Sequence, residues 1–188
     1  MVIRGNSGSG KSALAAAIRA ARPRGVAVIG QDLLRREILR VKEEPGTPAA
    51  EYIALSARFA LDHGLHVIVE GILYAAIYGD VLRELIADHR GMTLCYRYDL
   101  PFDETLRRHR TKPSAGSFGE EEMRRWWRDS DPLEGVSEEI IGLESTLAES
   151  TARVLTDCGW DRCQWQGAER TRTERMSAEM TEPEFAAF

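Results

Sequence analysis

The chain has 188 residues, of which 43% are hydrophobic and 29% are charged, and its formal net charge is −5. This length and composition suit one globular domain with a sizeable core. The sequence has no apolar run of the roughly 18–20 residues that span a bilayer and no signal-peptide layout, so we expect a cytoplasmic protein without a membrane partner. The acidic charge disfavours a dedicated binder of long nucleic acids, and three cysteines are too few for a disulfide framework.

Short apolar runs alternate with segments of helical periodicity up to about residue 158. The predicted strands are 1–5, 25–30, 66–71, 93–100 and 138–143, and the predicted helices are 12–22, a polar helix from Asp32 to the break at 43–48, 49–63, 81–89, 101–110, 120–129 and 147–158. Apolar runs bounded by glycine are typical of buried parallel strands. The alternation predicts an α/β fold, in which helices cover both faces of a parallel sheet.

The polar sequence of residues 161–188 lacks this periodicity. Its mixed charges and scarcity of apolar residues are typical of segments that do not pack into a core. We therefore expect one domain over residues 1–160 and a flexible tail over residues 161–188.

The segment GNSGSGKS at 5–12, called the phosphate loop below, matches the pattern G-x-x-x-x-G-K-[ST] between a predicted strand and a predicted helix. Its glycines allow tight turns that bring backbone N–H groups close to phosphate oxygens, and the following helix adds its positive end. Lys11 is expected to reach the β- and γ-phosphates and Ser12 Oγ to bind Mg²⁺. The predicted nucleotide-binding residues are Gly5, Asn6, Ser7, Gly8, Ser9, Gly10, Lys11, Ser12 and Ala13. The motif predicts a site for ATP and Mg²⁺.

Signatures of other nucleotide-hydrolysing proteins are missing from the sequence. It has no N-K-x-D segment of the kind with which GTPases read guanine. It also has neither a transporter-type L-S-G-G-Q segment nor an extended DEAD-like box. The remaining features favour a small kinase.

Two carboxylates follow predicted strands, whose carboxyl ends line the ligand crevice of such a sheet. Asp32 lies two residues past the second strand, where a carboxylate can accept a hydroxyl proton during in-line phosphoryl transfer. Because Asp is also a favoured N-cap, a purely capping role for Asp32 stays open. Glu70 ends the apolar run HVIVE and could hold a metal-bound water or a substrate hydroxyl; the alternative is a carboxylate that faces solvent.

The segment LRRHRTKP supplies a cluster of cations on a helix that leads into a loop: Arg107, Arg108, Arg110 and Lys112. Helical spacing puts Arg107 and Arg110 on one face and Arg108 elsewhere. We therefore expect Arg110, together with Arg107, to stabilise charge on a transferring phosphoryl group. The alternative is a solvated cationic surface.

Four further side chains lie near these candidates in the sequence. Arg35 and Arg36, one turn after Asp32, could bind an anionic or polyhydroxylated substrate or could simply be solvated. Trp126 and Trp127 are adjacent on a predicted helix and so diverge by roughly 100°. We expect one of the two tryptophans to pack in the protein, and the other could stack on a ring of a ligand.

The order of the phosphate loop, GQDLLRR, VIVEG and DLPFDETLRRHRTKP resembles the zeta-toxin, chloramphenicol-phosphotransferase and polynucleotide-kinase group of P-loop kinases, over about residues 1–158. The resemblance implies a nucleoside-monophosphate-kinase-like form of the P-loop NTPase fold. In that form five parallel strands have the order 2-3-1-4-5, and a mobile lid follows the fourth strand, here at about 107–135. It also implies that Asp32 is the base, that the lid arginine comes from 107–110, and that Glu70 helps to position the substrate.

Together these features predict a kinase that uses ATP and Mg²⁺ to phosphorylate a hydroxyl of a small polar acceptor, such as a nucleoside, sugar, nucleotide-sugar or antibiotic. No motif between Arg36 and Tyr52, where such kinases hold their substrate, points to one acceptor. A first alternative is a kinase for the 5′-hydroxyl of a nucleic-acid end. A second is a nucleotide-binding regulatory or scaffold protein without transfer activity.

Overall fold

The structure is a computed structural model, which describes residues 1–111, 116 and 118–160. The predicted tail at 161–188, Lys112 and most of the loop that follows it lie outside the described residues.

Five parallel strands form one sheet in the order β2-β3-β1-β4-β5, as predicted. The strands are β1 (Val2–Gly5), β2 (Val26–Gly30), β3 (His66–Gly71), β4 (Cys95–Tyr98) and β5 (Glu139–Ile141). Because β1 lies between β3 and β4, the phosphate loop begins at the middle of the carboxyl edge of the sheet. In open α/β sheets this is the position at which ligands bind.

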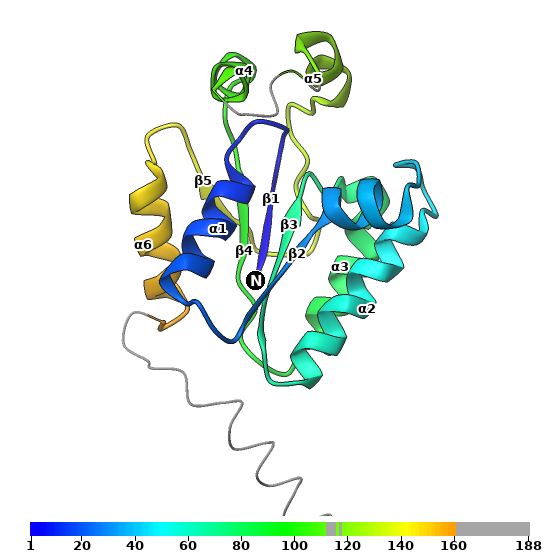
Figure 1. Cartoon of the computed structure of the whole chain (residues 1–188), viewed down its shortest axis with the longest axis vertical. Coiled ribbons are helices and arrows are strands. Elements are labelled where there is room, and N and C mark those ends of the chain that lie inside the picture. The colour runs from blue at the N-terminus through cyan, green and yellow to red at the C-terminus, as the bar shows by residue number, and fades with distance from the viewer. Residues whose placement is uncertain (112–115, 117, 161–188) are drawn as a thin grey trace, which may run out of the picture.

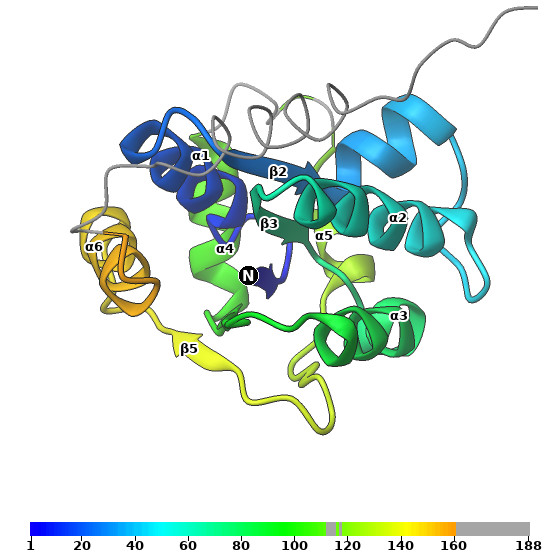
Figure 2. The ribbon, with the colours of Figure 1, turned by 90° about the horizontal axis from the view of Figure 1, so that it is seen from below.

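Helices cover both faces of the sheet (Figures 1 and 2). The helices of the described residues are α1 (Lys11–Ala21), η1 (Leu33–Leu39), α2 (Pro48–Asp62), α3 (Ala75–Asp88), α4 (Phe102–Arg110), α5 (Glu120–Trp126) and α6 (Leu147–Asp157). In Figure 1, α1 and α6 lie on one side of the sheet and α2 and α3 on the other, whereas α4 and α5 lie beyond the carboxyl ends of the strands. Among the described residues, no helix is long and apolar enough to cross a membrane.

Side chains that alternate along β1 anchor the start of the phosphate loop. Val2 packs into a core with Ile53 of α2 and Leu82 of α3, and Ile3 packs into a second core with Leu14 of α1. Successive residues of a strand point to opposite faces, so a shift of one residue would exchange the two cores. The packing therefore fixes the register of β1 and, with it, the position along the sheet at which the phosphate loop begins.

Helix α3 begins at Ala75, earlier than the predicted start at residue 81. Its first amide is capped from a distance: the Asp131 carboxylate accepts hydrogen bonds from the Ala75 N–H at 3.0 and 3.3 Å. The helix continues through Gly79, where an added Cβ would lie 3.4 Å from Leu133. Gly79 therefore lies against the segment around residue 133.

The predicted polar helix after Asp32 is a π-helix, η1. It ends where Arg40 takes a left-handed conformation with φ of 53° and donates its N–H to the Arg35 carbonyl. Short π-helical turns are rare and occur often at functional sites. Here η1 carries the first residues after β2 along the carboxyl edge of the sheet.

Candidate active site

The phosphate loop folds tightly against β4 and α4. Gly5, Gly8 and Gly10 have φ values of 140°, 80° and 112°, which side chains with a Cβ rarely adopt. A Cβ on Gly8 would lie 2.4 Å from the carbonyl oxygen of Thr105. No described side chain caps the first turn of α1, and that turn contains no acidic residue. The N–H groups and positive end of α1 are therefore directed at the loop, as phosphate binding requires.

Lys11 lies inside this loop rather than on the surface, and its residue exposure is 7%. Its Nζ donates to the Asn6 carbonyl at 2.8 Å and to Ser9 Oγ at 3.4 Å. The ammonium group is thus held in the middle of the loop, where it would meet the phosphates of a nucleotide.

Ser12 and Glu70 meet across neighbouring elements of the site. Ser12 Oγ donates to Glu70 Oε2 at 3.0 Å. Glu70 is paired in register with Gly30 of β2, and a Cβ on Gly30 would lie 3.0 Å from Glu70 Oε1. Glu70 therefore faces the loop. A hydroxyl and a carboxylate are hard oxygen ligands of the kind that Mg²⁺ prefers, so this pair fits a magnesium ion.

Asp32 presents an exposed carboxylate at the carboxyl edge of β2. It has helical dihedral angles and makes no side-chain capping bond, so the capping alternative is not realised. Its Oδ1 pairs with Arg36 Nε at 2.9 Å and more weakly with Arg35 Nη2 at 3.5 Å. The side chain remains 68% exposed. Its carboxylate is therefore accessible to a ligand at the edge where Glu70 ends the neighbouring strand.

A buried polar cluster lies behind Asp32. Arg35, whose side chain is only 10% exposed, approaches Glu43 Oε2 at 3.7 Å. Glu43 also accepts hydrogen bonds from Gln31 Nε2 and from the Tyr78 hydroxyl. The charge of Arg35 is therefore balanced within the protein. No local pattern predicts this role for Glu43, because it lies in a segment predicted only as a break between helices.

The arginines of α4 lie in different surroundings. Arg107 and Arg110 are 69% and 70% exposed and pair with Glu104 and Glu120. Arg108, predicted to point elsewhere, donates from Nη1 to the carbonyl of Ser9 in the phosphate loop at 2.9 Å. Arg108 of α4 therefore contacts the loop, whereas Arg107 and Arg110 are largely exposed and pair with glutamates.

The buried face of α4 explains this difference. Its buried residues are Thr105, Leu106 and His109. Thr105 and Arg108 are three positions apart and share a face, so the packing that brings Thr105 to Gly8 also brings Arg108 to the loop. Arg108 Nε donates to Glu104 at 2.6 Å, and hydrogen bonds from Arg107 and Arg108 lower the pKa of Glu104 to about 2.

The segment after α5 returns to the phosphate loop. The Asn6 side chain donates to the Arg128 carbonyl at 2.8 Å and accepts from the Arg128 N–H at 3.1 Å. The Trp126 carbonyl accepts from the Tyr74 hydroxyl at 2.6 Å, and burial raises the pKa of Tyr74 to about 12. Trp127 packs edge-on against Phe102, with ring centroids 5.1 Å apart. Sequence patterns gave no sign that Asn6 would bind another segment of the protein rather than a nucleotide alone.

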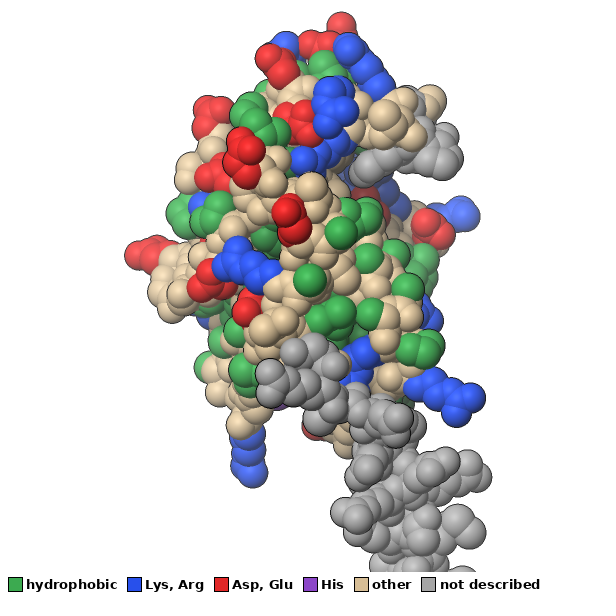
Figure 3. Space-filling view, turned by 90° about the vertical axis from the view of Figure 1, so that its left-hand side faces the viewer, with side chains coloured by type: hydrophobic (Ala, Val, Ile, Leu, Met, Phe, Trp, Pro, Cys, Tyr) green, Lys and Arg blue, Asp and Glu red, His purple; other side chains and the backbone are tan. Residues whose placement is uncertain are grey.

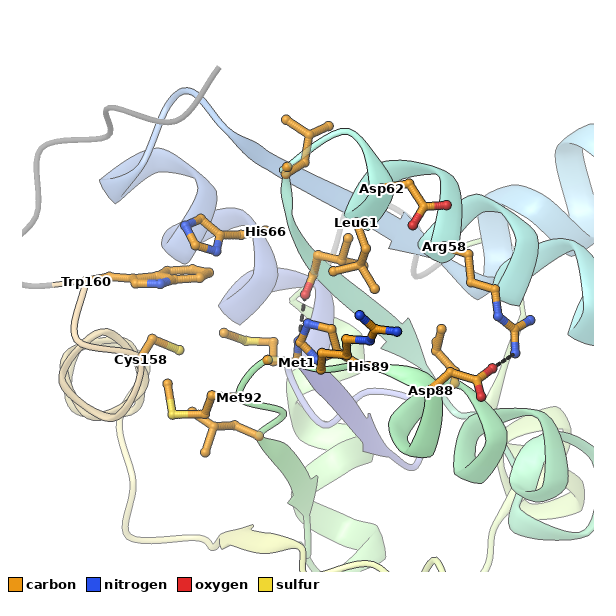
Figure 4. A pocket seen from close by; sticks show the side chains of 17 residues that line it. Met1, Arg58, Leu61, Asp62, His66, Asp88, His89, Met92, Cys158 and Trp160 are labelled. Carbon is orange, nitrogen blue, oxygen red and sulfur yellow. Dashed lines mark hydrogen bonds and ion pairs between the residues drawn. The ribbon is translucent and has the colours of Figure 1, made fainter. Parts of the chain in front are cut away.

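A hollow of about 860 Å³ lies at the opposite edge of the sheet (Figure 4). Met1, His66, His89 and Trp160 are among the residues that line it, and they lie near the amino ends of the strands. Its lining contains none of the candidate residues of the phosphate loop or of the carboxyl edge. The hollow is therefore separate from the candidate site.

Solved structures of kinases share the fold. A sugar kinase from a Janibacter species aligns with a TM-score of 0.57 and 20% identity over 87% of this chain and 97% of its own. A gluconokinase from Sinorhizobium meliloti aligns with a TM-score of 0.55 and 20% identity over 86% and 96% of the two chains. The APS kinase of Mycobacterium tuberculosis, solved with AMPPNP and APS, aligns with a TM-score of 0.56 and 18% identity over 82% and 95%. No protein-family model and no curated protein matches the sequence.

Proposed function

We propose that the protein is an ATP-dependent kinase that transfers the γ-phosphoryl group to a hydroxyl of a small polar acceptor. The observation that carries the proposal is the 3.0 Å contact between Ser12 of the phosphate loop and Glu70, with the exposed Asp32 at the end of the adjoining strand. A nucleotide site and a separate carboxylate for a hydroxyl are the parts that phosphoryl transfer requires.

Each residue of the candidate site has its own role in the proposed reaction. Lys11 and the loop N–H groups bind the β- and γ-phosphates, and Ser12 and Glu70 would hold Mg²⁺, which when bound neutralises charge on phosphate oxygens. Asp32 orients the acceptor hydroxyl and accepts its proton as the oxygen attacks the γ-phosphorus. Arg108, fixed by Glu104 beside the loop, adds positive charge near the transferring group.

We propose that residues 107–135, which include the end of α4, α5 and the segment after it, form the lid of the kinase; residues 112–115 and 117 lie outside the described residues. These helices lie beyond the carboxyl ends of the strands (Figure 1). A lid at this place excludes water, which limits wasteful hydrolysis of ATP. The roles of Arg107 and Arg110 in a closed lid stay predictions.

A small acceptor is favoured over a nucleic-acid end. Two cations of the predicted basic cluster, Arg107 and Arg108, both pair with Glu104. On the face that carries α6, Lys and Arg side chains are interspersed with Asp and Glu side chains (Figure 3). Nucleic-acid binding relies instead on a basic stripe that replaces counterions along the backbone.

The proposal is tested with Asp32→Asn. The protein would be incubated with ATP, Mg²⁺ and a pooled extract of metabolites, nucleosides and antibiotics, and mass spectrometry would search for species heavier by one phosphoryl group. We expect the variant to bind ATP normally and to form product roughly 10²- to 10⁴-fold more slowly, because a general base has been lost.

Asp88→Asn is the matched control. Asp88 is 65% exposed and pairs with Arg58 at 2.8 Å, much as Asp32 is 68% exposed and pairs with Arg36 at 2.9 Å. We expect this control to transfer phosphate at the wild-type rate. Equal rates in Asp32→Asn and Asp88→Asn would contradict the role of Asp32, and the absence of any product with ATP still bound would contradict the kinase proposal.

A further inference from the structure

Two guanidinium groups lie on aromatic rings of hydrogen-bonded residues, and one of them, that of Arg36, pairs with the proposed base. Arg36 Cζ is 5.3 Å from the ring centroid of Trp126, and Arg128 Cζ is 4.9 Å from that of Tyr74. The two aromatic residues are joined, because the Tyr74 hydroxyl donates to the Trp126 carbonyl at 2.6 Å. Both arginines therefore lie on aromatic residues of one hydrogen-bonded pair, Tyr74 after β3 and Trp126 at the end of α5.

Arg36 is the arginine of this region that can bind a ligand. Arg35 is buried and its charge is balanced by Glu43. Arg36 is 39% exposed, and its one ion pair, among the described residues, uses Nε and the Asp32 carboxylate. Stacking on Trp126 holds the guanidinium plane while its remaining N–H donors stay at the edge of that plane.

The ion pair with Asp32 competes with the proposed chemistry at one oxygen. Arg36 Nε lies 2.9 Å from Asp32 Oδ1, so it occupies one of the two oxygens that could accept the hydroxyl proton, although the carboxylate as a whole stays accessible. A neutral acceptor has no group that competes with Asp32 for the Arg36 guanidinium. An acceptor with an oxyanion has such a group, because a guanidinium binds carboxylates, phosphates and sulfates through two parallel hydrogen bonds.

We propose that the acceptor carries an oxyanion, bound by Arg36, and that this contact frees Asp32 Oδ1 to accept the hydroxyl proton. The inference rests on the proposed kinase function and adds the chemical class of the acceptor. It makes Arg36 a specificity-determining residue: an acceptor without the oxyanion leaves Asp32 paired and is phosphorylated slowly.

The test separates the pooled extract on an anion exchanger at neutral pH. The unretained and eluted fractions are each incubated with the protein, ATP and Mg²⁺, and mass spectrometry searches for species heavier by one phosphoryl group. We expect product from the eluted fraction. Product from the unretained fraction alone overturns the inference but leaves the kinase proposal standing, whereas product from neither fraction contradicts both.

Treatment of the eluted fraction with a phosphatase, which is then removed, tells the sources of the oxyanion apart. Loss of the product would identify a phosphate ester on the acceptor. Persistence of the product would identify a carboxylate or a sulfate. Both results support an oxyanion.

Kinetics with the product-forming acceptor test Arg36 itself. We expect Arg36→Gln to raise the KM for the acceptor roughly 10- to 100-fold, the effect of losing hydrogen bonds from a charged group, while the KM for ATP stays unchanged. Arg36→Lys keeps the charge but loses the paired N–H donors of the guanidinium, so its KM for the acceptor should lie between those of wild type and Arg36→Gln. Arg58→Gln, which removes a 40% exposed arginine from a similar ion pair, should match wild type. An unchanged acceptor KM in Arg36→Gln overturns the assignment.

Discussion

Glu70 and Ser12 join the phosphate loop to the neighbouring strand β3 through a side-chain hydrogen bond. Glutamate reaches Ser12 Oγ at 3.0 Å because Gly30 beside it has no side chain. Loss of the charge on Glu70 would leave this hydrogen bond possible, since a glutamine carbonyl also accepts from a hydroxyl. Substitution of Glu70 by glutamine can therefore remove the negative charge while the hydrogen bond with Ser12 stays possible.

We expect Glu70→Gln to raise the Mg²⁺ concentration for half-maximal activity by at least roughly tenfold, because one carboxylate charge at the ion is lost. The measurement is a magnesium titration of phosphoryl transfer at saturating ATP. The control is Glu84→Gln, which changes an exposed glutamate of α3. An unchanged magnesium requirement would show that Glu70 does not hold the ion.

At the scale of elements, α4 determines the shape of the phosphate loop as much as the loop's own glycines do. Gly8 lies so close to the Thr105 carbonyl that a Cβ would come within 2.4 Å of it. Arg108 from the same helix donates to Ser9. A change in the position of α4 would therefore move the loop that binds phosphate.

Gly8→Ala tests this packing against Gly46→Ala. The two glycines have φ values of 80° and 78°, but a Cβ at Gly46 would meet nothing within 4 Å. Gly46→Ala should lower the free energy of unfolding by about 1–2 kcal/mol, the cost of a left-handed conformation with a Cβ. Gly8→Ala should lower it by a further 1–3 kcal/mol, roughly, because the added methyl overpacks against backbone. Denaturant unfolding measures both, and equal losses would contradict the close packing.

The elements that the sequence could predict are those with a local signal. The phosphate loop is local because its glycines, Lys11 and Ser12 are consecutive, and the apolar runs identify the strands. The start of α3 has no such signal, since its cap is Asp131, 56 residues away. The choice of Arg108 over Arg110 depends on which face of α4 is buried. Tertiary packing determines which face of α4 is buried, and the polar sequence of this helix does not predict it.

Across the whole molecule, a buried arginine joins the middle of the sheet to segments far along the chain. Arg4 of β1 is 1% exposed and pairs with Asp131 at 2.7 Å and with Glu138 at 2.8 Å. Its Nε and Nη2 donate to the Leu73 carbonyl at 3.1 and 2.9 Å. These contacts hold the segment after α5 and the start of β5 at the base of the phosphate loop.

We expect Arg4→Met to lower the free energy of unfolding by about 3–5 kcal/mol, because it takes the shortest ion pair from the buried Glu138 and from the partly buried Asp131. The neighbouring Arg97 is the control, since its ion pairs with Glu138 and Asp99 are longer, at 3.4 and 3.9 Å. Arg97→Met should cost less. Denaturant unfolding of both variants checks the order, and a larger loss in Arg97→Met would show that Arg4 is not the main support.

The central position of β1 also has a consequence for biosynthesis. Strand β1 is made before both of its partners, β3 and β4, so one of its edges stays open until residues 95–98 have been made. The carboxylate of Glu138 reaches Arg4 later still, 134 residues along the chain. Pairings at such separation form slowly, and open strand edges in the meantime invite association between nascent chains. The arrangement that places the phosphate loop at the centre of the sheet therefore also leaves a strand edge open in the newly made chain until its second half has appeared.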